Sequence, residues 1–275
     1  MAKLVAHSTH RLMCGDSTDH ASVAILMSGE KASLLFTSPL YGNQRQYEIG
    51  KIDWDALMMG VFANLPMTDD GQILVNLGMI HTDGEWNDYW RGWVEWMRSH
   101  GWRRVGWYVW DQGSGLPGDF GGRFAPSFEF VFHFNREKRI NKSIACSTAG
   151  ETGGGGCRGA GDRKDTREHT VGKMKIPDNV IRINRDCSTS AEYDHPAIFP
   201  VALAAHMQEA FTDPQDICYE PFSGSGTPLM AGERTGRRVF AMEIASSYVD
   251  LALKRWVINT DQPAYLESTG ERFNG

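Results

Sequence analysis

The stretch Tyr219–Ile244, "YEPFSGSGTPLMAGERTGRRVFAMEI", has the pattern of a strand, a glycine loop, a helix and a second strand. Gly224 and Gly226 stand in the loop, and Glu243 comes at the end of the second apolar run. Glycines at a strand-to-helix turn let a ligand approach the backbone, and an acid about 20 residues further on can bind ribose hydroxyls. Leu229 stands where the dinucleotide-binding fingerprint has its third glycine, which disfavours a nicotinamide-dependent oxidoreductase.

The same alternation of strands and helices continues on both sides of this stretch. Apolar spacing predicts helices over residues 20–30, 54–65, 87–101, 200–211 and 246–257. Short apolar or alternating runs predict strands over residues 33–36, 71–78, 102–110, 128–134 and 216–222. Strands that alternate with helices in this way predict an α/β fold, a doubly wound and mostly parallel sheet covered by helices.

Composition and charge limit the class of protein. The chain of 275 residues is 41% hydrophobic and 23% charged, which is ordinary for a globular protein. No apolar run has the length of a membrane span, and "MAKLVAHSTHRLMCGD" lacks the features of a signal peptide. The five cysteines form no close pair, which indicates neither a zinc cluster nor a disulfide framework. We therefore expect a soluble, cytoplasmic protein with no membrane contact and no metal.

Positive charge is concentrated in one part of the chain. Residues 136–185 carry twelve Lys and Arg against six Asp and Glu, whereas the whole chain has a net charge of −6. The segment includes the glycine-rich run "AGETGGGGCRGAGDRKD", which is unlikely to form regular secondary structure. A basic segment on an acidic body is either a local contact for nucleic acid or a solvated loop, and charge alone does not decide between them.

A second group of polar residues follows the apolar run in "SLLFTSPLYGN" (33–43). Ser38, Pro39 and Tyr41 place a hydroxyl, a rigid ring and an aromatic side chain at the carboxyl end of the predicted strand. In α/β proteins this end of the sheet is where ligands bind.

Ser38-Pro39-Leu40-Tyr41, taken together with "EPFSGSGT", resembles the motif pair of the DNA amino-methyltransferases. These enzymes use S-adenosylmethionine to methylate N6 of adenine or N4 of cytosine. "RLMCGDSTD" and "HPAIFP" are similar to two further segments of the family. The catalytic motif precedes the cofactor loop, which is the circularly permuted order of the family's β group and favours DNA over RNA or protein as the substrate.

The resemblance implies a role for each motif residue. Ser38 and the carbonyl of Pro39 would accept hydrogen bonds from the target amine, and Tyr41 would stack on a base flipped out of the duplex. The residues that would bind the cofactor are Asp16, Phe199, Glu220, Phe222, Ser223, Gly224, Gly226, Thr227 and Glu243. Serine at the first motif position favours N4 of cytosine over N6 of adenine. No cysteine follows a proline, which excludes the nucleophile of the cytosine-C5 enzymes.

The resemblance also implies a domain plan. Residues 1–134 would form the catalytic half of a Rossmann-like methyltransferase domain and residues 195–275 its cofactor-binding half. Residues 135–194 would be an inserted target-recognition segment that contacts double-stranded DNA through Arg158, Arg163, Lys164 and Arg167. A homodimer and a restriction endonuclease partner are further expectations.

Two residues depart from the family pattern. Leu40 replaces the usual second proline, and Glu220 replaces the aspartate before Pro221 and Phe222. A catalytically inactive DNA-binding homologue is therefore one alternative, and a methyltransferase acting on RNA or protein is the other.

Overall fold

The structure is a computed structural model. It describes residues 3–6, 10–41, 53–115, 118, 121–139, 142–145, 152–153, 169–170, 173–185 and 199–273.

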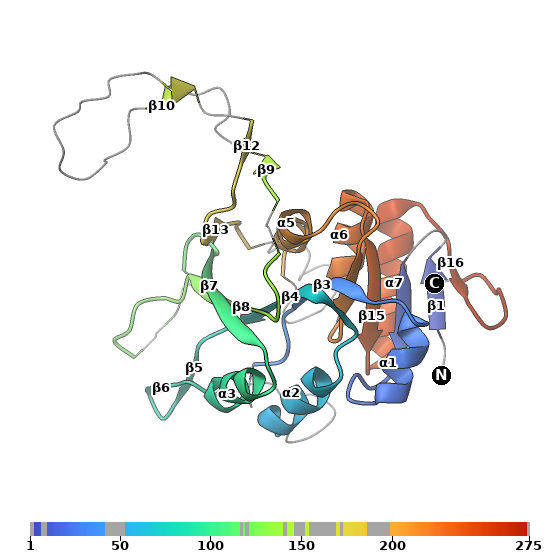
Figure 1. The fold of residues 1–275 in the computed structure, drawn as a ribbon, viewed down its shortest axis with the longest axis horizontal. Coiled ribbons are helices and arrows are strands. Elements are labelled where there is room, and N and C mark those ends of the chain that lie inside the picture. The colour runs from blue at the N-terminus through green and yellow to red at the C-terminus, as the bar shows by residue number, and fades with distance from the viewer. Residues whose placement is uncertain are drawn as a thin grey trace.

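A ten-stranded mixed sheet forms the centre of the molecule (Figure 1). Its strands lie in the order β13-β7-β8-β4-β3-β14-β15-β2-β1-β16. β14 runs parallel to its two neighbours, β3 and β15. The next strands outward, β4 and β2, run in the same direction. β8 runs antiparallel to β4 and β7 on one flank, and β1 runs antiparallel to β2 and β16 on the other. The predicted α/β fold is confirmed, with antiparallel strands added on both sides of the parallel centre. The strands are β1 (Lys3–Ala6), β2 (Arg11–Cys14), β3 (Ala32–Thr37), β4 (Met67–Leu77), β7 (Arg103–Asp111), β8 (Phe128–Asn135), β13 (Val180–Arg182), β14 (Ile217–Glu220), β15 (Arg238–Glu243) and β16 (Ala264–Leu266).

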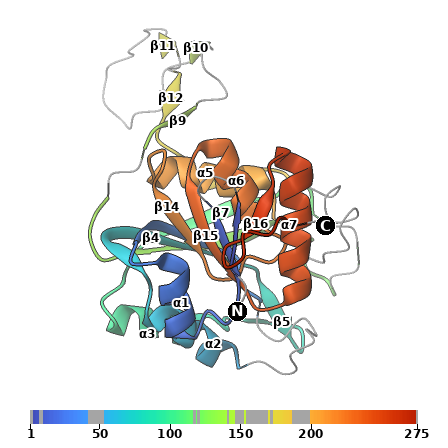
Figure 2. The same cartoon turned by 90° about the vertical axis from the view of Figure 1, so that its right-hand side faces the viewer.

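Helices cover both faces of this sheet (Figure 2). One layer consists of α1 (His20–Met27), α2 (Trp54–Ala63) and α3 (Arg91–Ser99), and the other of α5 (Val201–Phe211), α6 (Thr227–Thr235) and α7 (Ser246–Thr260). Neighbouring side chains of a strand point to opposite faces, so Leu34 packs in the α5–α7 layer and Leu35 in the α1–α3 layer. Burial on both faces explains why the central strands are almost continuously apolar.

The helix α6 begins and ends on glycines whose backbone most side chains would strain. Gly226 has φ +80° and Gly236 has φ +71°, both in the left-handed region. A Cβ on Gly226 would also come within 2.7 Å of the Cβ of Ala252 in α7. The glycine therefore allows the start of α6 to pack directly on α7.

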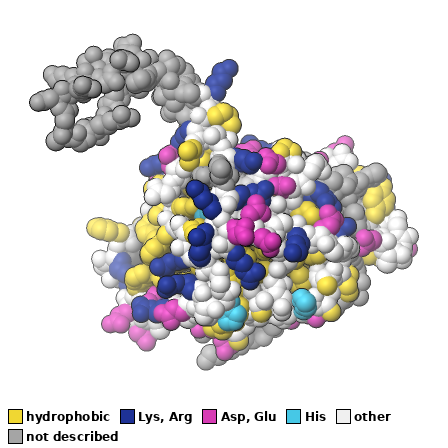
Figure 3. Space-filling view, viewed as in Figure 1, with side chains coloured by type: hydrophobic (Ala, Val, Ile, Leu, Met, Phe, Trp, Pro, Cys, Tyr) yellow, Lys and Arg dark blue, Asp and Glu magenta, His cyan; other side chains and the backbone are white. Residues whose placement is uncertain are grey.

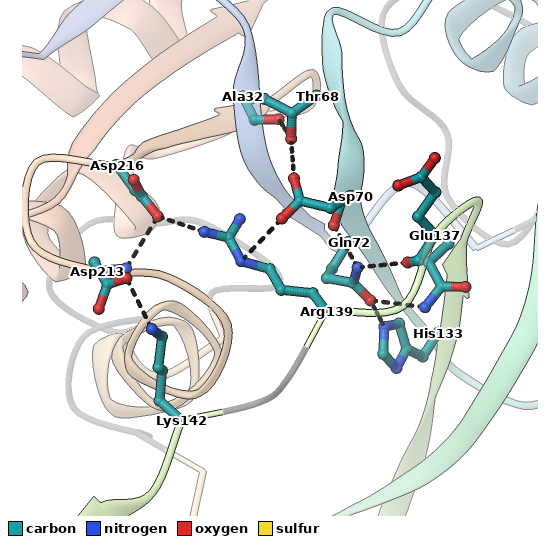
Figure 4. A network of polar contacts seen from close by, with 11 residues as sticks. Ala32, Thr68, Asp70, Gln72, His133, Glu137, Arg139, Lys142, Asp213 and Asp216 are labelled. Atoms are coloured by element: carbon teal, nitrogen blue, oxygen red, sulfur yellow. Dashed lines mark hydrogen bonds and ion pairs between the residues drawn. The ribbon is translucent and has the colours of Figure 1, made fainter.

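The segment predicted to recognise the target is attached to the sheet at both of its ends. At its start, Arg139 donates to Asp216 at 3.0 Å and lies 3.6 Å from Asp70 (Figure 4). The backbone N–H of Lys142 donates to the carbonyl of Ala210. These partners lie at the amino ends of β14 and β4 and at the end of α5. At its end, β13 pairs in parallel with β7 at the edge of the main sheet.

Between these attachments lie short strands that pair only with one another among the described residues. They are β9 (Ile144–Ala145), β10 (Thr152–Gly153), β11 (His169–Thr170) and β12 (Met174–Lys175), and they stand outside the main body (Figure 1). A hairpin of β5 (Ile80–Thr82) and β6 (Glu85–Asn87) follows β4. None of the described helices has the length and apolar character to cross a membrane.

Candidate active site

The carboxyl ends of the parallel strands meet at one edge of the sheet, next to its topological switch point. The chain passes from β3 through α2 to β4 in one direction, and from β14 through α6 to β15 in the other, so the switch lies between β3 and β14. Thr37, Glu220 and Glu243 end β3, β14 and β15 at this edge. Because β8 runs antiparallel to β4, its first residues lie at the same edge. Ligands of doubly wound sheets bind at such a crevice.

A cluster of four polar side chains lies at this edge and includes the predicted catalytic residues Ser38 and Tyr41. The hydroxyl of Ser38 lies 3.0 Å from that of Tyr41, which donates to Oε2 of Glu129 at 2.6 Å. The amide nitrogen of Asn76 lies 2.9 Å from the Tyr41 hydroxyl, 2.5 Å from Glu129 and 3.3 Å from Ser38. Three neighbouring strands thus supply the cluster: β3 leads into Ser38 and Tyr41, Asn76 lies in β4, and Glu129 lies in β8.

The direction of the hydrogen bonds in this cluster determines what Ser38 can do. Burial, reinforced by the charge of Glu129, holds the pKa of Tyr41 well above its usual range, so the phenol keeps its proton. That proton goes to Glu129, so the phenol oxygen can accept the proton of Ser38. Ser38 Oγ then keeps lone-pair capacity for a donor outside the cluster, such as an amine.

Leu40, where the resembling family has proline, is held by another contact. The indole Nε1 of Trp54 donates to the carbonyl of Leu40 at 2.7 Å. Pro39 is buried beside it, and a Cβ on Gly78 would come within 2.7 Å of the Tyr41 ring. These contacts fix the turn after β3 without a second proline.

Glu220 is the least solvated carboxylate of the described site, with 1% of its surface exposed. Oε1 accepts hydrogen bonds from the Thr37 hydroxyl and from the backbone N–H of Phe222, whereas Oε2 is buried without a hydrogen-bond partner among the described residues. Burial raises the pKa of Glu220 to about 8. A buried carboxylate oxygen without a partner fits a cationic group of a ligand, which would restore the ionised form.

The glycine loop and Glu243 form the adjoining part of the edge. The N–H of Gly224 donates to Oε2 of Glu243 at 2.8 Å, and the N–H of Ala245 donates to Oε1 at 3.0 Å. Burial raises the pKa of Glu243, and these two backbone donors oppose the shift. The Ser223 hydroxyl is buried without a partner among the described residues. Free acceptors on Glu243 and the free hydroxyl of Ser223 fit a ligand with hydroxyl groups.

The remaining predicted cofactor residues surround this loop. Thr227 begins α6, and its hydroxyl lies 3.4 Å from a guanidinium nitrogen of Arg255, which also donates to the Ser225 carbonyl at 2.6 Å. Phe199 packs edge-on against Phe36, with 5.5 Å between the ring centroids. The other three are Phe222, which packs half-buried on the α1–α3 layer, Gly226, which caps α6, and the exposed Asp16, which accepts from Thr18 at 2.8 Å.

The structure brings most of the predicted residues to one edge, but not all of them can be placed. Arg158, Arg163, Lys164 and Arg167, predicted to contact DNA, lie outside the described residues. Among the described residues, no group of three or more His, Cys, Asp or Glu side chains is arranged to hold a metal ion.

Sequence reasoning missed Thr37, Asn76 and Glu129. Asn76 interrupts the apolar run "ILVNL", and Glu129 interrupts "FEFVF". A polar residue within a buried strand is a signal of a functional side chain. Neither signal says which strand neighbours which. The pairing of β4 with β3 and β8 was needed to bring these residues to Ser38.

Known proteins resemble this chain over most of its length. A family model described as DNA methylase matches residues 32–254. The type II methyltransferase M.XycI of Xanthomonas campestris pv. cyanopsidis is 24% identical over 263 residues, which cover 80% of this chain and 79% of that protein. The orphan methyltransferase M.BamHII of Bacillus amyloliquefaciens is 27% identical over 151 residues, which cover 50% of this chain and only 57% of that relative.

Solved structures share the fold. The PvuII DNA methyltransferase, described as cytosine-N4-specific, superimposes with a TM-score of 0.66 at 22% identity, over 93% of this chain and 89% of that chain. The complex of M1.HpyAVI with SAM gives a TM-score of 0.57 at 14% identity, over 89% and 98% of the two chains.

Proposed function

Because the chain belongs to the DNA methylase family, we propose that it transfers a methyl group from S-adenosylmethionine to an exocyclic amine of a DNA base. We propose N4 of cytosine as the target, in preference to N6 of adenine. The observation that carries the proposal is Ser38, whose hydroxyl proton is directed to Tyr41 and whose oxygen can accept from an amine. The description of M.XycI as a type II methyltransferase supports it, and so does the PvuII DNA methyltransferase, which is described as cytosine-N4-specific.

The residues present fit the cofactor of this family. The unpaired Oε2 of Glu220 suits the ammonium of a methionine group, and Glu243 with Ser223 suits ribose hydroxyls. The carboxylate of Glu220 is longer than the usual aspartate, and its contact with Thr37 holds it against the sheet. The bound cofactor supplies an electrophilic methyl group on a sulfonium.

The protein's own residues would prepare the amine for this methyl group. The lone pair of a base amine is delocalised into the ring, so the amine is a poor nucleophile. Hydrogen bonds from both amine protons, to Ser38 Oγ and to the Pro39 carbonyl, would turn the lone pair toward the methyl group. The amine nitrogen would then be placed to take the methyl group that the cofactor supplies, and the proton that the amine gives up would pass to water. Tyr41, Asn76 and Glu129 hold Ser38 in position for this step.

The remaining expectations concern partners and location. We propose that the unplaced residues Arg158, Arg163, Lys164 and Arg167 contact the DNA backbone of a double-stranded substrate. A homodimer, a restriction endonuclease partner and a cytoplasmic location remain predictions.

Mass spectrometry of nucleosides tests the proposal most directly. Unmethylated phage DNA incubated with the protein and S-adenosylmethionine should yield N4-methylcytosine. Ser38→Ala should abolish this product while cofactor affinity, measured by calorimetry, stays within a few-fold. N6-methyladenine would correct the target base. Methyl transfer to RNA or protein but not to DNA, or cofactor binding without any transfer, would refute the proposal.

A further inference from the structure

The loop between β7 and β8 carries an exposed aromatic ring close to the catalytic cluster. The structure describes residues 112–115, 118 and 121–127 of this loop, which leads directly into β8 and Glu129. Phe124 is 100% exposed. It precedes Glu129 by five residues, so the two Cα atoms lie at most about 17 Å apart. A fully exposed aromatic ring gains free energy when a partner buries it.

The base of this loop is held firmly, although its tip is exposed. The N–H of Gln112 donates to the carbonyl of Ser127 at 2.8 Å. Arg185 connects both sides, because it donates to the Gln112 side chain at 2.6 Å and to the carbonyl of Pro126 at 3.2 Å. A Cβ on Gly115 would come within 2.6 Å of the Cβ of Ala125, so the two arms of the loop lie in direct contact.

A second contact ties the tip to the β5–β6 hairpin. Arg123, next to Phe124, donates to the carbonyl of Gly84 at 3.3 Å. That hairpin follows β4 at the same edge and presents Trp86, which is 53% exposed. The ring of Phe124 is therefore displayed on a supported loop. On the face drawn in Figure 3, Lys and Arg side chains stand among Asp, Glu and hydrophobic side chains.

We propose that Phe124 enters the base stack of duplex DNA and fills the space left by the flipped target base. The inference rests on the proposed function. The position of the loop identifies DNA as the partner of Phe124. A base held at Ser38 must come from a duplex lying across this edge, and the loop leads into Glu129, which bonds to Tyr41. Apolar side chains inserted between base steps stabilise unstacked DNA, and aromatic rings replace lost base stacking.

The test compares two short duplexes that contain the methylated site after it has been mapped on phage DNA. One has the target base normally paired and the other has it opposite a mismatched base, which is cheaper to flip. Phe124→Ala should lower kcat/KM about tenfold on the paired duplex, as expected for one lost base–aromatic stacking contact. Its loss on the mismatched duplex should be clearly smaller, and Phe124→Leu, which keeps an apolar side chain, should retain most of the activity.

Two controls separate this inference from general damage and from the proposed function. Ile258→Ala removes another exposed apolar side chain, 69% exposed on α7, and should change neither rate. Wild-type activity of Phe124→Ala on the paired duplex, or an equal loss on both duplexes, would overturn the role of Phe124 alone. A wild-type protein that methylates no site on phage DNA would overturn the proposed function and this inference with it.

Discussion

Tyr41 has two possible roles, stacking on the target base through its ring and hydrogen bonding to Ser38 through its hydroxyl. If Tyr41 acts only by stacking on a base, Tyr41→Phe keeps that role intact. In the structure the hydroxyl accepts from Ser38 and donates to Glu129, so its removal leaves the serine proton without its acceptor. We expect Tyr41→Phe to lower kcat about tenfold to a hundredfold, the range for a lost hydrogen bond that leaves a buried partner unpaired. Single-turnover methylation measures this, and an unchanged rate would favour stacking alone.

Glu220 makes the stability of the free protein depend on pH. Its pKa of about 8 lies above the usual value of 4.5, so the folded protein binds more protons than the unfolded chain between these pH values. The free energy of unfolding therefore falls as the pH rises through this window. From pH 6 to 7.5 we expect a loss of about 2 kcal/mol through this group.

Urea unfolding of Glu220→Gln at the two pH values measures that contribution. The variant should lack this part of the pH dependence, while the contribution of Glu243 remains in both proteins. Identical pH dependences in the two proteins would show that Glu220 ionises normally.

At the scale of elements, the two ends of α6 offer a matched pair of substitutions. Gly226→Ala and Gly236→Ala both place a side chain at positive φ, which costs about 1 to 2 kcal/mol. Only at Gly226 does the new Cβ also meet Ala252, whereas nothing lies within 4 Å at Gly236. We expect Gly226→Ala to lose about 2 to 5 kcal/mol because overpacking adds to the strain. Urea unfolding gives both values, and equal losses would show that α7 moves aside at no cost.

The sequence predicts those helices and strands whose own hydrophobic periodicity identifies them, without information about their neighbours in the fold. The strand after residue 33, the run "GQILVNLG" and the helices flanking the glycine loop all appear close to their expected positions. The strands β1, β13 and β16 were not predicted, because three or four residues carry too little periodicity and their pairing is decided by distant partners. The catalytic contacts of Asn76 and Glu129 were missed for the same reason, since they depend on which strands are neighbours.

At the scale of the whole molecule, the segment predicted to recognise the target begins far from Ser38. Arg139 anchors its start at the amino ends of β4 and β14, whereas Ser38 follows the carboxyl end of β3. The six residues of β3 span about 20 Å, roughly the separation of the two edges. The segment returns along β13, which pairs in parallel with β7 at the edge of the sheet.

Salt dependence tests whether the segment makes such contacts. Replacing Arg158, Arg163, Lys164 and Arg167 with alanine should weaken duplex binding and flatten the salt slope by about 0.9 for each lost phosphate contact. Fluorescence anisotropy of a labelled duplex across a salt series provides both quantities, and calorimetry should show unchanged cofactor affinity. Wild-type affinity and slope in the quadruple variant would make the segment a linker.

The antiparallel pairing of β1 with β16 has an evolutionary consequence. Leu4 pairs with Leu266 and Ala6 with Ala264, so strands from the two ends of the described chain are neighbours in the sheet. A short peptide could join them, and the chain could be opened instead between residues 185 and 199 without cutting a described strand or helix. In the reordered gene the cofactor loop would be encoded before the catalytic motif, yet every strand would keep its neighbours. Motif order in such proteins can therefore change by moving the point where the gene begins, while the architecture is inherited intact.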